Sequence, residues 1–393
     1  MGYEQQPAII TTRPALDSLV ERLRSLGWFA FDTEFVGEDR YKPEVCLIQV
    51  ATDEIQALID PLAGIDVLPV WELVADPSIR TVVHAGTEDL ALCQIQTGRP
   101  AANVVDLQIA AGLIGLGYPT SLAKLTRTAT GTRLHKSQTL TDWRRRPLEA
   151  DQISYAVEDV IHLPAIHRFI HARLEALGRM AWAEMEFEEL CIAAAKQTTN
   201  PTQLRRLKGA GSLNARELSI AEALLAERDQ LAMELDRPAR TVVRDHLIAE
   251  LARRGWTDPH RIRSLRGLNL GMANIKRLAK VIETAKSQPA KDHPDLATEG
   301  DTNEEEVLLS VLSAVLRDYC NRNQISYSLL ASKDDLRQIV RRRTRADEPN
   351  GNIHLCSGWR GKALGSLLED VLSGQKALRV EGSDRKFRLR LDS

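Results

Sequence analysis

The segment Trp28–Phe35, WFAFDTEF, decides the fold, because an apolar run ends there in two acidic residues, Asp32 and Glu34. Side chains alternate along a β-strand, so these two carboxylates leave the same face of the sheet. Two carboxylates that close repel each other, and divalent metal ions offset that repulsion. An isolated acidic pair at a strand end is more often simply solvated, so this segment alone leaves both interpretations open.

Further acidic residues follow at two places that can meet this strand. Glu88 and Asp89 come after a short apolar strand, Thr81–Val83, and open a predicted helix. Tyr155 and Asp159 stand four positions apart in the helical run DQISYAVEDVIHL. That spacing places both on one helix face, one turn apart. A strand, a helix start and a second helix therefore supply acids and a tyrosine for one site.

These motifs resemble those of the ribonuclease D family of DEDD exonucleases, in the subgroup with tyrosine in the third motif. The first motif is FDTEF followed by Y-x-P-x-x-C-L-I-Q at Tyr41–Gln49. The second is HAGTEDL at His84–Leu90, and the third is YAVEDV at Tyr155–Val160. A further similar block, Leu134–Ala156, precedes the third motif.

The resemblance implies a catalytic set in which four carboxylates bind two divalent metal ions and a tyrosine assists. The metal ligands are Asp32, Glu34, Asp89 and Asp159, and the tyrosine is Tyr155. Carboxylates without histidine or cysteine favour Mg²⁺ or Mn²⁺. Tyrosine has a pKa of about 10 and is a poor base at neutral pH, so we expect it to orient the attacking water. We expect Glu88 to face solvent or support the ligands, and His84 to be structural.

The chain order predicts an α/β domain with a mixed sheet over residues 1–196. A helix at Ala15–Leu26 leads into the first strand. Two apolar runs, Val45–Ala51 and Ile55–Ile59, are joined by a turn so short that their strands must be antiparallel. Helices and strands then alternate over residues 67–113, which implies parallel strands. The resemblance implies the ribonuclease-H-like fold.

A polar and basic loop leads to the third motif. It contains three consecutive arginines, Arg144–Arg146, which could hold substrate phosphates. The neighbouring Trp143 could stack on a base, but we expect it to anchor the loop in the core. Pro164 is predicted to end or kink the helix that carries Asp159.

The rest of the chain is predicted to form two more domains. Residues 201–288, which follow the linker QTTNPT, resemble an all-α helicase-and-RNase-D C-terminal (HRDC) domain. Residues 303–393 are similar to a divergent, mostly α, second HRDC-like domain. This last segment departs from a helical bundle at its end, because Lys376–Val380 and Phe387–Leu391 predict a terminal β-hairpin.

The charge distribution and the cysteine content indicate which binding partners and which cell compartment fit the chain. From Pro201 to Ala290 there are 17 lysines and arginines against 10 acidic residues, so this part carries +7 and the rest −9 of the total of −2. A basic domain beside an acidic one fits phosphate attraction, and equally a solvated helical face. The five cysteines form no C-x-x-C pair, and no export signal or apolar run of about 20 residues occurs. We therefore expect a cytoplasmic protein with no membrane association. The sequence does not determine the oligomeric state, for which we expect a monomer.

The motifs predict a 3′-to-5′ exoribonuclease that releases nucleotides from RNA 3′ ends by two-metal hydrolysis. Transfer RNA precursors and other structured RNAs are the expected substrates. A DNA 3′-to-5′ exonuclease is an alternative, since the same metal chemistry serves either sugar. A catalytically inactive nucleic-acid-binding scaffold is another. No G-x-x-x-x-G-K-[ST] phosphate loop occurs, which favours a nuclease over a helicase.

Overall fold

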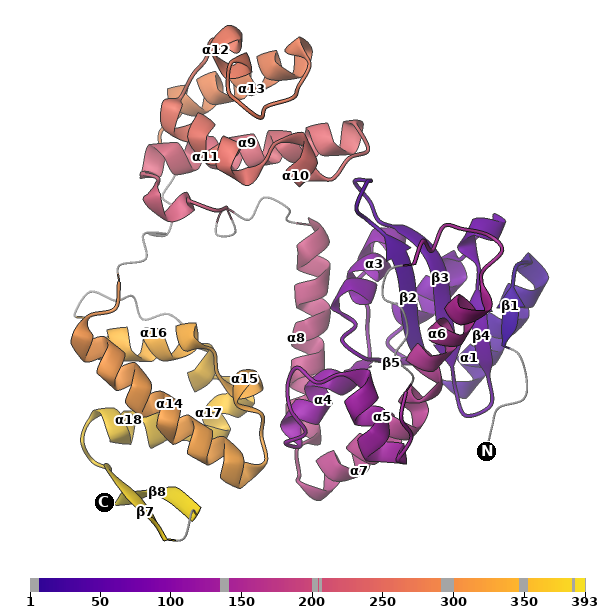
Figure 1. Cartoon of the computed structure of the whole chain (residues 1–393), viewed down its shortest axis with the longest axis vertical. Coiled ribbons are helices and arrows are strands. Elements are labelled where there is room, and N and C mark those ends of the chain that lie inside the picture. The colour runs from indigo at the N-terminus through magenta and orange to yellow at the C-terminus, as the bar shows by residue number, and fades with distance from the viewer. Residues whose placement is uncertain are drawn as a thin grey trace.

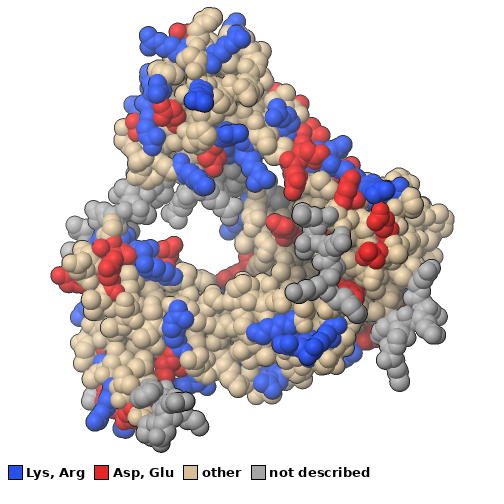
Figure 2. Space-filling view, viewed as in Figure 1, with Lys and Arg blue, Asp and Glu red and all other residues tan. Residues whose placement is uncertain are grey.

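The structure is a computed structural model that describes residues 7–134, 141–199, 204, 207–290, 300–345, 353–383 and 386–392. The elements form three groups (Figure 1), and the space-filling view shows an opening between them (Figure 2). The first contains a β-sheet with helices on both faces, the second is helical, and the third is helical with a terminal β-hairpin. The predicted fold class, a mixed α/β domain followed by helical segments, is confirmed.

The sheet of the first group is mixed. Its strands are β1 (Ala8–Ile10), β2 (Trp28–Val36), β3 (Glu44–Ala51), β4 (Gln56–Ile59), β5 (Arg80–Val83) and β6 (Val104–Asp106), in the spatial order β1-β4-β3-β2-β5-β6. The predicted antiparallel meander runs through β2, β3 and β4, and β5 and β6 are parallel to each other. Strand β1, which was not predicted, adds parallel to β4 at the sheet edge.

Strand β2 separates two hydrophobic cores because its side chains alternate. Phe29 and Phe31 point into one core, where Phe31 meets Trp71 edge-on at 5.4 Å between ring centroids. Ala30 points into the other core. Asp32 and Glu34 continue the face of Ala30. They also lie beyond the part of β2 that pairs with β5, which ends at Ala30, so the acidic end of the strand is open on that side.

Helices cover both faces of this sheet. Buried side chains of α1 (Arg13–Leu26), α2 (Leu68–Val74) and α3 (Thr87–Thr97) fill the core of Phe29 and Phe31. Those of α4 (Leu107–Leu113), α5 (Leu122–Thr130) and α7 (Leu163–Ala176) fill the core of Ala30. Helix α8 (Met180–Thr199) contributes to both cores, and α6 (Ala150–Ile161) packs across β2, β3 and β4.

Pro164 separates α6 from α7, as predicted. Helix α6 ends at Ile161, and Pro164 occupies the first turn of α7. A proline is tolerated there because the first N–H groups of a helix have no partner within it. The break leaves Asp159 in the last turn of α6, close to β2.

The second group of elements is a helical bundle with its own core. It consists of α9 (Ala215–Glu234), α10 (Ala239–Val242), α11 (Asp245–Arg254), α12 (Pro259–Arg263) and α13 (Met272–Ser287). It contacts the loop that follows strand β2. The Tyr41 hydroxyl donates to Asp229 at 2.9 Å, and the Tyr41 backbone N–H donates to Asp236 at 3.2 Å. The Tyr41 ring also packs against the bundle core.

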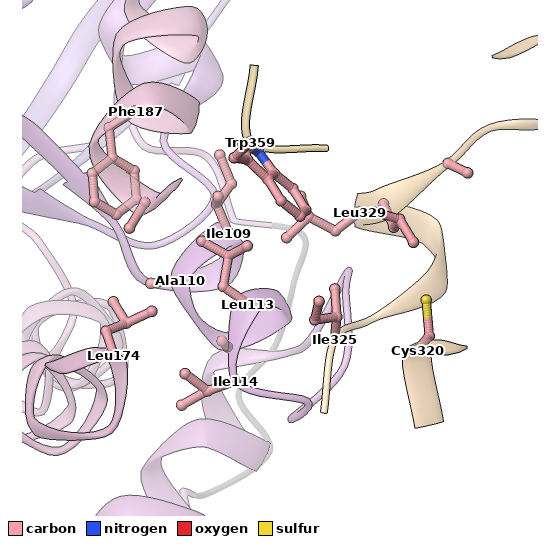
Figure 3. Close-up of a cluster of buried hydrophobic side chains, with 14 of the residues drawn as sticks. Ile109, Ala110, Leu113, Ile114, Leu174, Phe187, Cys320, Ile325, Leu329 and Trp359 are labelled. Atoms are coloured by element: carbon pink, nitrogen blue, oxygen red, sulfur yellow. The ribbon is translucent and has the colours of Figure 1, made fainter. Parts of the chain in front are cut away.

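The third group comprises α14 (Asn303–Asn323), α15 (Tyr327–Leu330), α16 (Lys333–Thr344), α17 (Gly358–Leu364), α18 (Leu367–Leu372) and the strands β7 (Ala377–Ser383) and β8 (Lys386–Asp392). The antiparallel pairing of β7 and β8 confirms the predicted hairpin. Figure 3 shows Ile109 and Leu113 of α4 in one cluster with Ile325, Leu329 and Trp359. The C-terminal segment therefore shares a hydrophobic core with the sheet domain.

Buried polar contacts reinforce this shared core. Glu186 of α8 accepts hydrogen bonds from Arg360 at 2.6 and 2.9 Å and from the Trp359 indole at 2.6 Å. Arg179 donates to the backbone carbonyls of Leu113 at 2.6 Å and Gln324 at 2.9 Å. We keep the division at 1–196, 201–288 and 303–393 as a proposal, with the third segment packed as an extension of the first.

Candidate active site

The structure brings all five predicted site residues together around the open end of β2. Asp32 and Glu34 lie on that strand, and Asp89 lies in the first turn of α3, where it is buried. Tyr155 and Asp159 lie on α6, which packs against β2. Sequence segments separated by more than a hundred positions thus meet because β2 is central in the sheet.

Burial raises the pKa values of all four carboxyl groups, and repulsion within the cluster adds to the rise for Asp32 and Glu34. For Asp32, burial and then the negative charges of Asp89, Asp159 and Glu34 raise the pKa well above its ordinary value. Burial, Asp159 and Asp89 raise the pKa of Glu34 to about 8. Burial raises the pKa of both Asp89 and Asp159 to about 6. Such mutual interactions require the four carboxylates to lie close to one another.

Tyr155 lies against the acidic cluster with its proton retained. Burial, followed by the charges of Asp159, Glu34 and Asp32, raises the pKa of its phenol above the ordinary value. Its hydroxyl hydrogen-bonds to Asp159, which lowers the pKa of that carboxyl. The ring lies 6.0 Å from that of Trp143 between centroids, and Trp143 packs on a small core with Leu47 and Leu58. Trp143 therefore anchors its loop, as predicted, and also supports Tyr155.

Thr33 was missed in the sequence, although it lies between two site residues in FDTEF. Its hydroxyl donates a hydrogen bond to Asp89 Oδ1, and both residues are only 7% exposed. Because it alternates with Asp32 and Glu34, its side chain points to the face on which α3 packs. Thr33 thus connects the strand to the carboxylate at the start of α3.

Asp106 was missed as well. At the end of β6, its carboxylate caps α4 by accepting from the Gln108 and Ile109 N–H groups, at 2.7 and 3.2 Å. It also accepts from the Gly86 N–H at 3.0 Å, so it fixes the turn that precedes Asp89. The available signal was an acidic residue between an apolar strand and a helical run, which is a typical N-cap position.

Two predicted neighbours of the site have the expected roles. His84 Nε2 lies 3.0 Å from the Thr120 carbonyl oxygen, and burial lowers the pKa of the imidazole. It is therefore a neutral, structural histidine near neutral pH. Glu88 is exposed, next to Asp89, and its charge contributes to raising the pKa of Asp89.

The loop that contains Arg144–Arg146, here called the arginine loop, makes contacts that the sequence did not predict. Arg144 makes a two-pronged ion pair with Asp39, at 2.7 Å for each contact, and a third contact to Glu44 at 2.7 Å. Arg146 binds Asp60 in the same two-pronged way and donates to the Cys46 carbonyl. These two guanidinium groups fasten the loop to the sheet domain, so phosphate binding by them would compete with these ion pairs and stays a prediction. The third arginine of the loop is exposed.

The fold and the clustered acidic site are those of a 3′-5′ exonuclease. Residues 7–175 match the 3′-5′ exonuclease domain family, and residues 217–283 match the HRDC domain family. No helix in the described ranges is long and apolar enough to span a membrane.

The chain belongs to the ribonuclease D family. It is 31% identical to ribonuclease D of Acidiphilium cryptum over 96% of each chain. It is also 31% identical to ribonuclease D of Gluconacetobacter diazotrophicus, over 96% of this chain and 95% of that protein. The crystal structure of Escherichia coli RNase D, an exoribonuclease involved in structured RNA processing, superimposes with a TM-score of 0.79 at 30% identity, over 94% of this chain and 99% of that one. The protein is thus a 3′-to-5′ exoribonuclease, a phosphodiester hydrolase.

Proposed function

We propose that this exoribonuclease trims the 3′ ends of structured RNAs, including transfer RNA precursors, with two Mg²⁺ or Mn²⁺ ions held by its acidic cluster. The observation that carries the proposal is the electrostatic interaction among Asp32, Glu34, Asp89 and Asp159. A role in structured RNA is supported by the Escherichia coli relative, whose reported activity is structured RNA processing.

The donor set fits hard divalent cations. All four acidic groups offer oxygen, the ligand that Mg²⁺ and Mn²⁺ prefer, and their crowding is unfavourable until positive charge is added. Among the described residues, no three acidic, histidine or cysteine side chains are placed as ligands of one metal ion in this structure. When bound, the two ions would supply Lewis-acid activation of water and of the scissile phosphate and would offset the charge on the leaving oxygen.

The protein's own groups contribute position and proton placement. Asp32 and Glu34 are fixed by the sheet register, in which Asp32 lies opposite Gln49 and Glu34 opposite Leu47. Tyr155 keeps its proton at neutral pH, so its hydroxyl acts as a hydrogen-bond donor that orients the attacking water or the scissile phosphate. Its support by Trp143 limits the motion of the ring.

The helical bundle supplies further positive charge near the site. Arg237, Arg240 and Arg244 are exposed and have no carboxylate partner among the described residues. They follow α9, beside the contacts of Asp229 and Asp236 with Tyr41. We assign them to RNA phosphate binding, which is one of the two roles that the charge of this domain leaves open.

We further infer a monomer that works in the reducing cytoplasm. All five cysteines are free thiols, and all but Cys356 are buried. Burial raises the pKa of the Cys93 thiol to about 12, which keeps it unreactive. Light scattering of the purified chain measures the oligomeric state directly.

The test compares matched RNA and DNA oligonucleotides, each with a free or a blocked 3′ end, with and without Mg²⁺. The proposal predicts stepwise, Mg²⁺-dependent shortening of RNA from a free 3′ end. Faster degradation of DNA than of RNA would favour a DNA exonuclease instead. Binding without shortening of either strand would favour the scaffold alternative.

A further inference from the structure

The sequence between Asp106 and Asp142 contains no acidic residue, although 54 of the 393 residues of the chain are Asp or Glu. The same stretch contains Lys124, Arg127 and Arg133. It therefore carries positive charge with no neutralising partner nearby in sequence. The stretch includes α5 and connects the second motif to the third.

Helix α5 presents these cations on its outer side. Leu125 and Thr126 are buried, whereas Lys124 and Arg127 are exposed neighbours three positions apart. Arg133 follows, also exposed, just beyond the end of the helix at Gly131. Figure 2 shows lysine and arginine side chains gathered over the region that α5 occupies in Figure 1. We call Lys124, Arg127 and Arg133 the α5 strip.

The α5 strip is unpaired, unlike many exposed arginines of this domain. In the described part of the chain, none of its three residues makes an ion pair. Lys124 Nζ donates to the Leu116 carbonyl at 2.8 Å, which uses one of its three protons. By contrast, Arg22 pairs with Glu54 at 2.9 Å, as do other exposed arginines with their own acidic partners.

The strip also lies next to the catalytic elements. Thr120, just before α5, accepts from Gln108 at 3.0 Å and contacts His84 at 3.0 Å, and His84 begins the turn that leads to Asp89. Helix α5 packs on α7, which directly follows the helix that carries Tyr155. The start of α5 and the helix on which it packs are therefore both connected to elements that carry site residues.

We propose that Lys124, Arg127 and Arg133 bind phosphates of the RNA strand upstream of the 3′ nucleotide being removed. The proposal rests on the exoribonuclease activity and adds a second phosphate-binding surface to that of the helical bundle. Flexible lysine and arginine side chains that contact only phosphates read no sequence, which suits an enzyme that shifts its substrate by one nucleotide per cycle.

The test removes charge from the strip. Arg127→Gln and Arg133→Gln are combined, and initial rates are measured on a long single-stranded RNA and on a trinucleotide over a range of salt concentrations. Each phosphate contact to a single strand contributes about 0.7 to the slope of log affinity against log salt, or about fivefold at 0.1 M salt. We expect KM for the long RNA to rise about 25-fold and its salt slope to fall by about 1.4, with a smaller effect on the trinucleotide.

Two further variants serve as controls. Arg127→Lys with Arg133→Lys keeps the charge and should restore most of the affinity. Arg99→Gln removes an exposed arginine next to the C-terminal end of α3, the end away from Asp89, and should leave KM and slope unchanged. An unchanged salt slope in the glutamine variant, or an equal loss in Arg99→Gln, would overturn the proposal. Absence of RNA degradation by the wild-type protein would instead refute the function on which the proposal rests.

Discussion

Replacement of Arg360 by methionine tests how the C-terminal segment is attached to the catalytic domain. Arg360 donates to both oxygens of Glu186 and also to the Leu329 and Leu330 carbonyls, at 2.9 and 3.1 Å. The side chains of Arg360 and Glu186 are only 6% and 8% exposed. The substitution would leave a buried carboxylate with Trp359 as its remaining donor.

The expected cost follows from this burial. Removal of one partner from a buried ion pair destabilises a protein by about 3 to 5 kcal/mol, because the other charge stays buried and unpaired. The double variant Glu186→Met with Arg360→Met buries no charge, so it should recover most of that loss. Arg168→Met is the matched control, because Arg168 pairs with Asp53 on the surface, where both side chains are more than half exposed. Its expected cost is below about 1 kcal/mol.

Urea denaturation monitored by tryptophan fluorescence measures these differences. Trp182 and Trp359 stack at 4.9 Å between ring centroids at this junction and report on it directly. Equal stability of the Arg360→Met and Arg168→Met variants would refute the argument. So would a separate early transition of the C-terminal segment in the wild-type protein, because a shared core predicts that the two parts unfold together.

Three further outcomes are expected. Tyr155→Phe should lower kcat by about 10² to 10³ with little change in KM, because only an orienting hydroxyl is lost; a normal kcat would exclude that role. Thr33→Val should lower kcat by about tenfold and raise the Mg²⁺ concentration needed for half-maximal rate, whereas Thr33→Ser keeps the hydroxyl and should behave as wild type. In protein freed of divalent ions, burial and repulsion raise the pKa of Glu34 from 4.5 to about 8. The contribution of Glu34 to folding stability should therefore be full below about pH 4.5 and be lost as the pH rises through 8. Glu34→Gln should flatten this pH dependence in thermal melts, and an unchanged profile would contradict the crowding of the carboxylates.

Local sequence patterns predicted much of the sheet and site, because their physical causes are local. The short turn before Ile55 forces antiparallel pairing, and the spacing of Tyr155 and Asp159 places them on one helix face. Strand β1 was missed because three residues, Ala8–Ile10, are too few to show an alternating pattern. Thr33 was missed because a neutral hydroxyl gives no charge pattern.

Contacts between segments that are far apart in the sequence produce no local sequence pattern from which they could be predicted. Arg144 and Arg146 looked available for phosphate because their partners, Asp39 and Asp60, lie far back in the sequence. The close approach of the C-terminal segment to α4 could not be predicted from the sequence for the same reason. At Gly112 an added Cβ would lie 2.8 Å from the Leu329 side chain, so a larger residue would force that side chain to shift, yet a single glycine does not reveal its distant neighbour.

The central claim is that the acidic cluster on β2, α3 and α6 performs Mg²⁺-dependent hydrolysis, and Asp159→Asn tests it most directly. Asp151→Asn is the matched control, because Asp151 is an exposed acid on the same helix. Single-turnover degradation of a 3′-labelled RNA with Mg²⁺ as the only divalent ion should slow by about 10³-fold or more in Asp159→Asn and stay at the wild-type rate in Asp151→Asn. A near-normal rate in Asp159→Asn would contradict the assignment of the site.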